Sequence, residues 1–251
     1  MPEEKTFSSP ARDDTITDNR YVGFCDILGF SDRLLTNFDA TLKVYKDFAQ
    51  TFSKVPANEA EVTIYSDAIL ITGYSLGRVA CTIQNLWFIA LANDLMIRGA
   101  ITQGRYWQQR QGNHMLVASD ALVRAVKLER SVGIPAVVIA DDLAIPDEVW
   151  LHRFANGLLQ TPILHFRDRN IVNPFNIFWF RSAGDRTSQL MAASPSHRDK
   201  YLWFLALHEA VGNNQELIPP VVFARFVRDG ILQMRTEVAD QNADAGAPKA
   251  S

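Results

Sequence analysis

Strand-like and helix-like segments alternate along the middle of the chain, and this order restricts the fold more than any other feature. The apolar run Tyr21–Ile27 is typical of a buried strand, and Ser31–Phe52 has large apolar residues at the spacing of an amphipathic helix. Apolar positions then alternate on both sides of Ser66 and Asp67, which predicts a hairpin with Asp67 at its tip. The order strand, helix, hairpin predicts a mixed sheet of the α/β or α+β class.

Later segments continue this alternation. The patterns predict helices at 78–96 and 119–129, a short helix opened by Pro146, and strands at 97–106, 115–118, 136–140 and 162–166. The final third is expected to be mostly helical, at 200–211 and 220–238. We therefore expect one globular domain over residues 20–238 with a helical C-terminal addition. Polar composition predicts a disordered arm at 1–19 and a disordered tail at 239–251.

Charge and cysteine content narrow the function classes. The chain has 28 acidic and 25 basic residues, a formal charge of -3, which argues against nucleic acid as a partner. Its two cysteines have no metal-ligand spacing, and the N-terminus lacks a signal-peptide pattern, so a cytoplasmic location is expected. The longest apolar stretch, around 86–97, is shorter than the roughly 20 residues of a membrane span, so we expect no direct membrane insertion.

Two aspartates stand where predicted strands end. Asp26 closes the first strand and is followed by Gly29, while Asp67 lies at the hairpin tip. If these strands are neighbours, the two carboxylates could hold a divalent metal ion against phosphate oxygens, with backbone N–H groups at the following helix start beside them. Each aspartate also has an ordinary explanation, Asp26 as a helix cap and Asp67 as a common turn residue.

Four segments carry a family resemblance in order and spacing. They resemble the signature segments of class III nucleotidyl cyclase catalytic domains, and they are Phe24–Ser31, Ser66–Ala68, Ile97–Gly104 and Ser119–Glu129. The resemblance extends from about Tyr21 to Phe166. It implies an α+β class III cyclase fold, with a mixed sheet, a ferredoxin-like core and flanking helices.

The resemblance also implies a two-metal site. Asp26, Asp67 and the backbone carbonyl of Ile27 would hold two divalent ions, Mn or Mg, against a nucleoside triphosphate. The substrate's phosphates would lie on Gly29, Phe30 and Ser31. The proton acceptor stays open between a water on a metal ion, Asp26 and the substrate's own phosphate.

Departures from the family pattern concern the base. Purine cyclases have a lysine at the position of Thr63, and their second base-reading group aligns near Leu116. Both charges are missing, and Tyr65, on the same strand face as Thr63, could fill the pocket with its ring. A site that has lost these hydrogen-bonding groups should prefer another base.

The transition-state residues depart as well. The family's asparagine and arginine align with Val123 and Lys127. Valine cannot hydrogen-bond, so the asparagine role is lost or moved, with Arg124 as the candidate, whereas Lys127 keeps a positive charge. Arg169 is a further candidate for the triphosphate. A solvated helix face is the alternative for Lys127 and Arg124, and an exposed charged turn is the alternative for Arg169.

These features resemble the pyrimidine cyclases of bacterial Pycsar antiphage defence. That resemblance implies a uridylate cyclase, active as a head-to-tail homodimer, that makes cyclic UMP for a cyclic-nucleotide-responsive effector. The alternatives are a cytidylate or purine cyclase, a degenerate cyclase domain that binds nucleotide or dimerises, and a general two-metal hydrolase.

Overall fold

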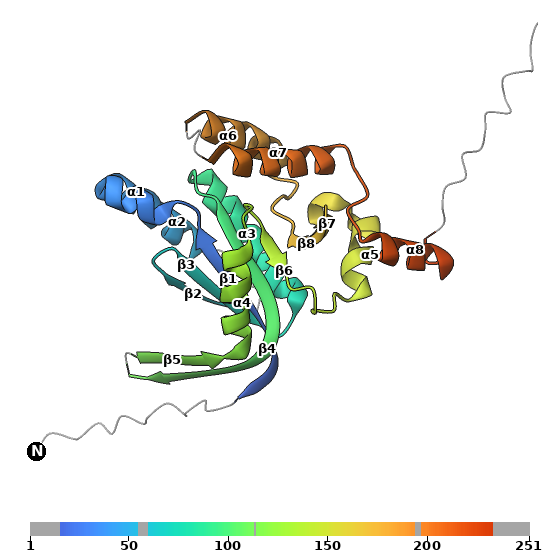
Figure 1. Cartoon of the computed structure of the whole chain (residues 1–251), viewed down its shortest axis with the longest axis horizontal. Helices are drawn as coiled ribbons and strands as arrows, with labels where there is room; N and C mark the ends of the chain where they lie inside the picture. The colour runs from blue at the N-terminus through green and yellow to red at the C-terminus, as the bar shows by residue number, and fades with distance from the viewer. Residues whose placement is uncertain (1–15, 55–59, 113, 194–196, 233–251) are drawn as a thin grey trace, which may run out of the picture. The chain divides into compact units, whose positions relative to one another are not determined.

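The computed structural model describes residues 16–54, 60–112, 114–193 and 197–232. Its strands form a single mixed sheet in the order β2-β3-β1-β4-β6-β8-β7, and β5 pairs with β4 (Figure 1). The strands are β1 Thr17–Ile27, β2 Glu61–Tyr65, β3 Ala68–Gly73, β4 Ile97–Gln111, β5 His114–Ser119, β6 Val137–Ile139, β7 Ile163–Phe166 and β8 Arg169–Val172. Pairing is antiparallel throughout the described sheet except between β4 and β6.

The helices connect these strands. They are α1 Phe30–Thr36, α2 Phe38–Phe52, α3 Leu76–Ala92, α4 Asp120–Ser131, α5 Asp147–Asn156, the 3-10 turn η1 Leu158–Gln160, α6 Phe180–Ala193, α7 Arg198–Gly212 and α8 Pro220–Arg228. The run from β1 to β4 is strand, helices, hairpin, helix, strand, and its sheet order is β2-β3-β1-β4. This is the ferredoxin-like arrangement, so the predicted α+β class with a mixed sheet and flanking helices is confirmed.

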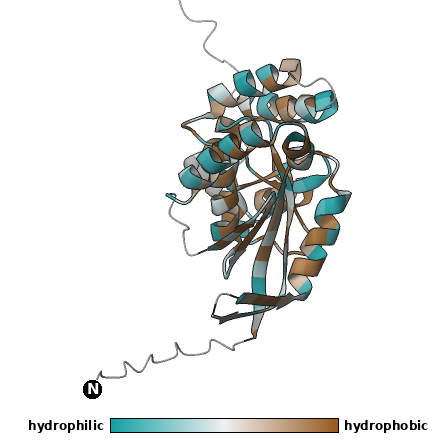
Figure 2. Cartoon of the chain, turned by 90° about the vertical axis from the view of Figure 1, so that its left-hand side faces the viewer, coloured by the Kyte–Doolittle hydropathy of each residue, from teal (hydrophilic) through white to brown (hydrophobic). Residues whose placement is uncertain are grey.

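Helices α3 and α4 cover opposite faces of the sheet. A Cβ on Gly23 of β1 would lie 3.0 Å from Ile83 of α3, whereas the next residue back, Val22, packs with Ala121 of α4. Neighbouring strand residues point to opposite faces, so α4 covers the face that also carries Asp26. Figure 2 shows the central strands as mostly hydrophobic between helices of mixed character.

Helix α7 packs on its own chain. The ring of Phe204 lies 5.3 Å from that of Trp87 on α3 and 5.2 Å from that of Phe175, centroid to centroid. Both Trp87 and Phe204 are fully buried. Aromatic packing of this kind anchors α7 to the core. Residues from Ile218 onward form a separate unit, and its described part contains α8.

Several predicted boundaries differ from the structure. The helix expected at 31–52 is divided at Asn37, whose side chain accepts a hydrogen bond from the Ala40 N–H and thereby caps α2. β1 begins at Thr17, inside the predicted arm, and β4 continues through Gly104 rather than turning there. Sequence patterns missed β8 and α6. Residues 1–15 and 233–251, which include most of the predicted arm and the whole tail, lie outside the described residues.

Candidate active site

Asp26 lies at the carboxyl end of β1, directly opposite Arg98 on β4. The Nη2 atom of Arg98 is 3.3 Å from the Oδ2 atom of Asp26 and donates a hydrogen bond to it. On its other side, Arg98 Nε lies 2.6 Å from Oε1 of Glu129, a buried residue of α4. These two atoms form an ion pair, although their orientation does not meet hydrogen-bond geometry. Arg98 therefore bridges two carboxylates and fixes where Asp26 stands.

The local environment disfavours the negative charge of Asp26. Burial is the main cause that raises its pKa, and Arg98 opposes this effect. The negative charges of Asp67 and Glu129 raise the pKa further. The Arg98 guanidinium does not fully offset the burial of Asp26 and the two neighbouring carboxylates. A further positive charge would therefore stabilise this corner of the sheet, where Asp26 and Asp67 lie.

Asp67 reaches the same corner from the turn between β2 and β3. Its carbonyl oxygen accepts a hydrogen bond from the Ile27 N–H at 3.1 Å, and its Oδ2 accepts one from the Ser31 hydroxyl at 3.0 Å. The preceding residue, Ser66, has a φ of 56°, so the turn uses a left-handed backbone conformation. The predicted hairpin is confirmed, and the structure brings Asp67 beside Asp26.

The oxygen donors at this corner suit a hard divalent cation. Mg²⁺ is commonly bound by one or two carboxylates, with waters and substrate phosphates completing its coordination. Asp26 and Asp67 supply the two carboxylates, and the main chain at Ile27 adjoins both. In the described ranges, no group of three or more His, Cys, Asp or Glu side chains could hold a metal ion. Any ion here would thus need backbone, water or phosphate oxygens as further ligands.

The segment after Asp26 has the backbone geometry of a tight turn. Gly29 has a φ of 69°, a conformation that favours glycine, and no side chain caps α1 behind it. Phe30 is buried with its ring 5.1 Å from that of Tyr45, so its side chain belongs to the core. Helix α1 has only 7 residues, so its positive end is weaker than that of the long helix expected from the sequence. Of the predicted phosphate-binding residues in this turn, Ser31 contacts a site carboxylate, through its hydrogen bond to Asp67.

Thr63 and Tyr65 lie on β2, on the strand face predicted for them. Tyr65 pairs with Ala68 across the hairpin and directly precedes the Ser66–Asp67 turn. Its side chain is 82% exposed. An exposed aromatic ring beside the Asp67 turn could stack on a base.

Leu116 and Arg169 do not approach Asp26 within this chain. Leu116 pairs with Gln109 of β4, whereas Asp26 pairs with Arg98, which is 109 − 98 = 11 positions away, or about 36 Å of strand. Figure 1 shows this β4–β5 hairpin at the end of the sheet away from α1. Arg169 is exposed on β8, three strands from β1, which is about 14 Å of lateral separation.

Helix α4 carries the predicted transition-state residues on its outer side. Val123 is 54% exposed and Lys127 is exposed, whereas Glu129, two residues later, is buried against the sheet. Arg124 already has partners, because it donates to the Gln103 carbonyl at 3.2 Å and contacts Asp142 at 2.5 Å. Within one chain, Val123 and Lys127 therefore point away from Asp26.

Sequence reasoning assigned no role to Arg98 or Glu129. Each left a signal, since Arg98 interrupts the apolar strand 97–101 and Glu129 follows Ala121 and Ala125 at a helical spacing of four, on the buried face. A charged residue on a buried face usually has a partner, and here Arg98 and Glu129 are partners of each other.

No protein-family model matches the sequence, and no curated protein matches it. Similar solved structures include the adenylyl cyclase CyaB from P. aeruginosa, at 12% identity and a TM-score of 0.44, over 63% of this chain and 96% of that one. The guanylyl cyclase Cya2 has 10% identity and a TM-score of 0.43, over 63% and 91%. A class III adenylyl cyclase-like ATP-binding protein from Pseudomonas aeruginosa has 10% identity and a TM-score of 0.45, over 68% of this chain and 40% of that one.

None of the helices in the described ranges is long and apolar enough to cross a membrane.

Proposed function

We propose that the chain is a nucleotidyl cyclase that converts UTP to 3′,5′-cyclic UMP and pyrophosphate. The observation that carries this proposal is the meeting of Asp26 and Asp67 at one end of the sheet, beside the Gly29 turn. Two carboxylates next to an open backbone turn suit a triphosphate with its counter-ions.

In this reaction the 3′-hydroxyl of the ribose gives up its proton, to a water, to Asp26 or to the substrate's own phosphate, and its oxygen bonds to the α-phosphorus. The bond from that phosphorus to the bridging oxygen breaks, and the electron pair leaves with pyrophosphate. Two divalent ions, when bound, would lower the pKa of the 3′-hydroxyl and neutralise the triphosphate. Arg98 and Glu129 hold Asp26 in position, and the Ser31 hydroxyl orients the Asp67 carboxylate.

The base preference rests on β2. Thr63 stands where a purine cyclase is expected to carry its base-reading lysine, and the exposed ring of Tyr65, on the same strand face, can stack on a pyrimidine. The resemblance to Pycsar cyclases supports cyclic UMP as a second messenger for an antiphage effector. Cytidylate and purine cyclases are the rival assignments.

The site should be shared between two copies of the chain. Leu116 is remote from its own Asp26 and Lys127 faces away from it, so both can serve only an Asp26 of another copy. Mixing an Asp26→Ala chain with a Lys127→Ala chain should restore activity. At equal amounts about half the dimers are mixed and each has one intact site, so about a quarter of wild-type turnover is expected. Absence of any recovery in a mixture shown to contain heterodimers would contradict the shared site.

Metal-dependent release of pyrophosphate tests the enzyme assignment. Asp26→Asn and Asp67→Asn should each abolish release, while Asp39→Asn, an exposed acid in the first turn of α2, should leave it unchanged. Full release by both site variants would overturn the assignment of these carboxylates.

A non-enzymatic nucleotide-binding domain is the second candidate. The apolar Val123 and the engagement of Arg124 by Asp142 favour it, because both positions would otherwise stabilise the reacting phosphate. Binding of UTP by wild-type protein without release of pyrophosphate would select this candidate.

A further inference from the structure

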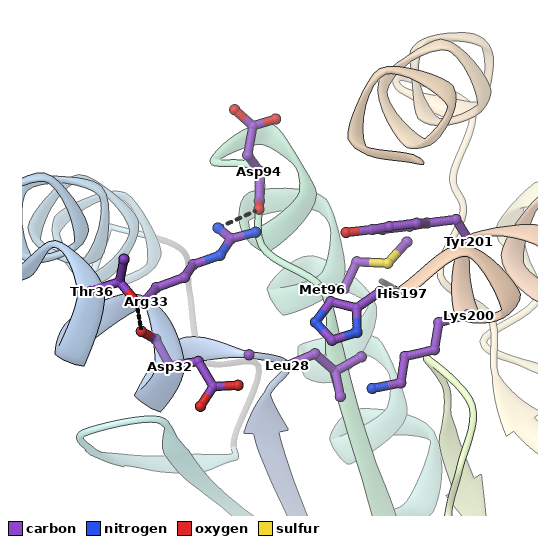
Figure 3. Close-up of a pocket in the computed structure, with 10 residues that line it drawn as sticks. Leu28, Asp32, Arg33, Thr36, Asp94, Met96, His197, Lys200 and Tyr201 are labelled. Atoms are coloured by element: carbon purple, nitrogen blue, oxygen red, sulfur yellow. Dashed lines mark hydrogen bonds between the residues drawn. The ribbon is translucent and has the colours of Figure 1, made fainter. Parts of the chain in front are cut away.

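A pocket of about 430 Å³ adjoins the Gly29 turn and lies against the start of α7 (Figure 3). Gly29 lines it, and Figure 3 shows Arg33 on one side, Asp94 above, and His197, Lys200 and Tyr201 from the start of α7 on the other side. The volume is within the range of small-molecule sites. Helix α7 lies beyond the region that resembles class III cyclases, so this wall is a feature of the C-terminal addition.

The pocket has an excess of positive charge. Arg186 neutralises the carboxylate of Asp94, with its Nε 2.7 Å from Oδ1. Arg33 donates only to the backbone oxygen of Asp94, at 3.1 Å, so its charge is not paired there. Lys200 forms no ion pair with any carboxylate in the described ranges. Two cations, Arg33 and Lys200, thus oppose the single remaining acid of the described wall, Asp32.

The pocket adjoins the turn that follows the proposed catalytic residue Asp26. Leu28 and Gly29, which line it, follow Asp26 by two and three residues, and Leu28 N–H donates to the Met96 carbonyl at 2.8 Å. A Cβ on Gly29 would lie 3.5 Å from Nε2 of His197, so the imidazole adjoins the turn itself. Figure 3 shows His197, which precedes α7, and Lys200 of α7 projecting toward the segment that carries Leu28.

We propose that this pocket binds the terminal phosphates of the substrate and then the pyrophosphate that leaves, with Lys200 as the main contact and His197 as a second. The inference rests on the proposed cyclase function. When the α-phosphorus bonds to the 3′-oxygen, whose proton ends in solvent, the electron pair of the broken bond adds negative charge to pyrophosphate. The Lys200 ammonium stabilises that charge, and the anchoring of α7 by Phe204 holds the ammonium in place.

Binding of inorganic pyrophosphate, measured by calorimetry with Mn²⁺, tests the pocket without any turnover. Lys200→Gln should weaken binding about tenfold or more, as expected for loss of a charge-assisted hydrogen bond, and Lys200→Arg should restore most of it. Arg198→Gln is the matched control, because Arg198 is exposed on the same turn of α7 and does not line the pocket. Urea midpoints of all variants should agree, since none of these side chains is fully buried.

The results separate the pocket from the reaction. Weaker pyrophosphate binding and a raised KM for UTP in Lys200→Gln support both proposals. If Lys200→Gln binds pyrophosphate more weakly but the wild type forms no cyclic nucleotide, the proposed phosphate pocket is supported and the proposed cyclase activity is overturned. Unchanged binding in Lys200→Gln, or no pyrophosphate binding by the wild type, overturns the pocket, whatever the cyclase activity.

Discussion

Removal of the Glu129 carboxylate should destabilise the fold, because it leaves Arg98 without its closest partner. Glu129 is 4% exposed, and its Oε1 lies 2.6 Å from Arg98 Nε. Breaking a fully buried ion pair costs about 3–5 kcal/mol. The Arg98 side chain is 29% exposed and keeps Asp26 at 3.3 Å, so part of that cost is recovered through water and Asp26. We expect Glu129→Ala to lower the free energy of unfolding by about 2–3 kcal/mol, roughly 30- to 150-fold in the equilibrium.

Urea unfolding followed by circular dichroism measures this loss. Glu209→Ala, an exposed glutamate on α7, is the control and should change the free energy of unfolding by less than about 0.5 kcal/mol. In a Glu129→Ala background, Arg98→Met should cost less than it does in the wild type, because the two residues are coupled. A loss below about 1 kcal/mol for Glu129→Ala, or strictly additive effects of the two substitutions, would refute the proposed role of this pair.

Three further outcomes follow from the same corner and the strands beneath it. Burial raises the pKa of Asp26, so the folded state binds its proton more tightly than the unfolded state does. In metal-free protein at pH 7, Asp26→Asn should therefore have a higher free energy of unfolding than the wild type. Urea titrations should show this difference shrink as the pH falls below the ordinary pKa of aspartate. Ser31→Ala removes the exposed bond to Asp67, so assays should find turnover reduced while the free energy of unfolding falls by less than about 1 kcal/mol. Gly99→Ala places a Cβ against the Phe24 carbonyl oxygen and should lower the free energy of unfolding by about 1–3 kcal/mol or more, measured by urea unfolding. An unchanged free energy of unfolding would contradict the close strand packing.

The ferredoxin-like order was predictable because its signals are local. Strand alternation around Ser66 and Asp67 and the helix period after Asp26 each depend on residues close in sequence. The break at Asn37 was missed because the apolar period continues across it, and only the side-chain cap to Ala40 reveals it. Arg167–Asp168 is an exposed charged turn, as the sequence suggested, but with Arg167 at a φ of 56° it closes a hairpin, and the strand β8 that follows was missed.

The site was predictable to the extent that it lies in single segments. Asp26 and Asp67 were identified from their strand ends, but the link from Asp26 through Arg98 to Glu129 joins three elements, and no local pattern shows such pairing. The α7 wall of the pocket was beyond sequence reasoning for the same reason, since Lys200 and Gly29 meet only after α7 packs on α3. The metal-binding role of the two aspartates stays a prediction.

One measurement tests the central claim most directly. The purified protein is incubated with Mn²⁺ and each of ATP, GTP, CTP and UTP, and the cyclic nucleotide and pyrophosphate formed are separated and quantified. We predict equal amounts of cyclic UMP and pyrophosphate from UTP, little product from the other three, and none after Asp26→Asn or Asp67→Asn. No cyclic product from any of the four triphosphates, or unchanged product from both variants, would contradict the account.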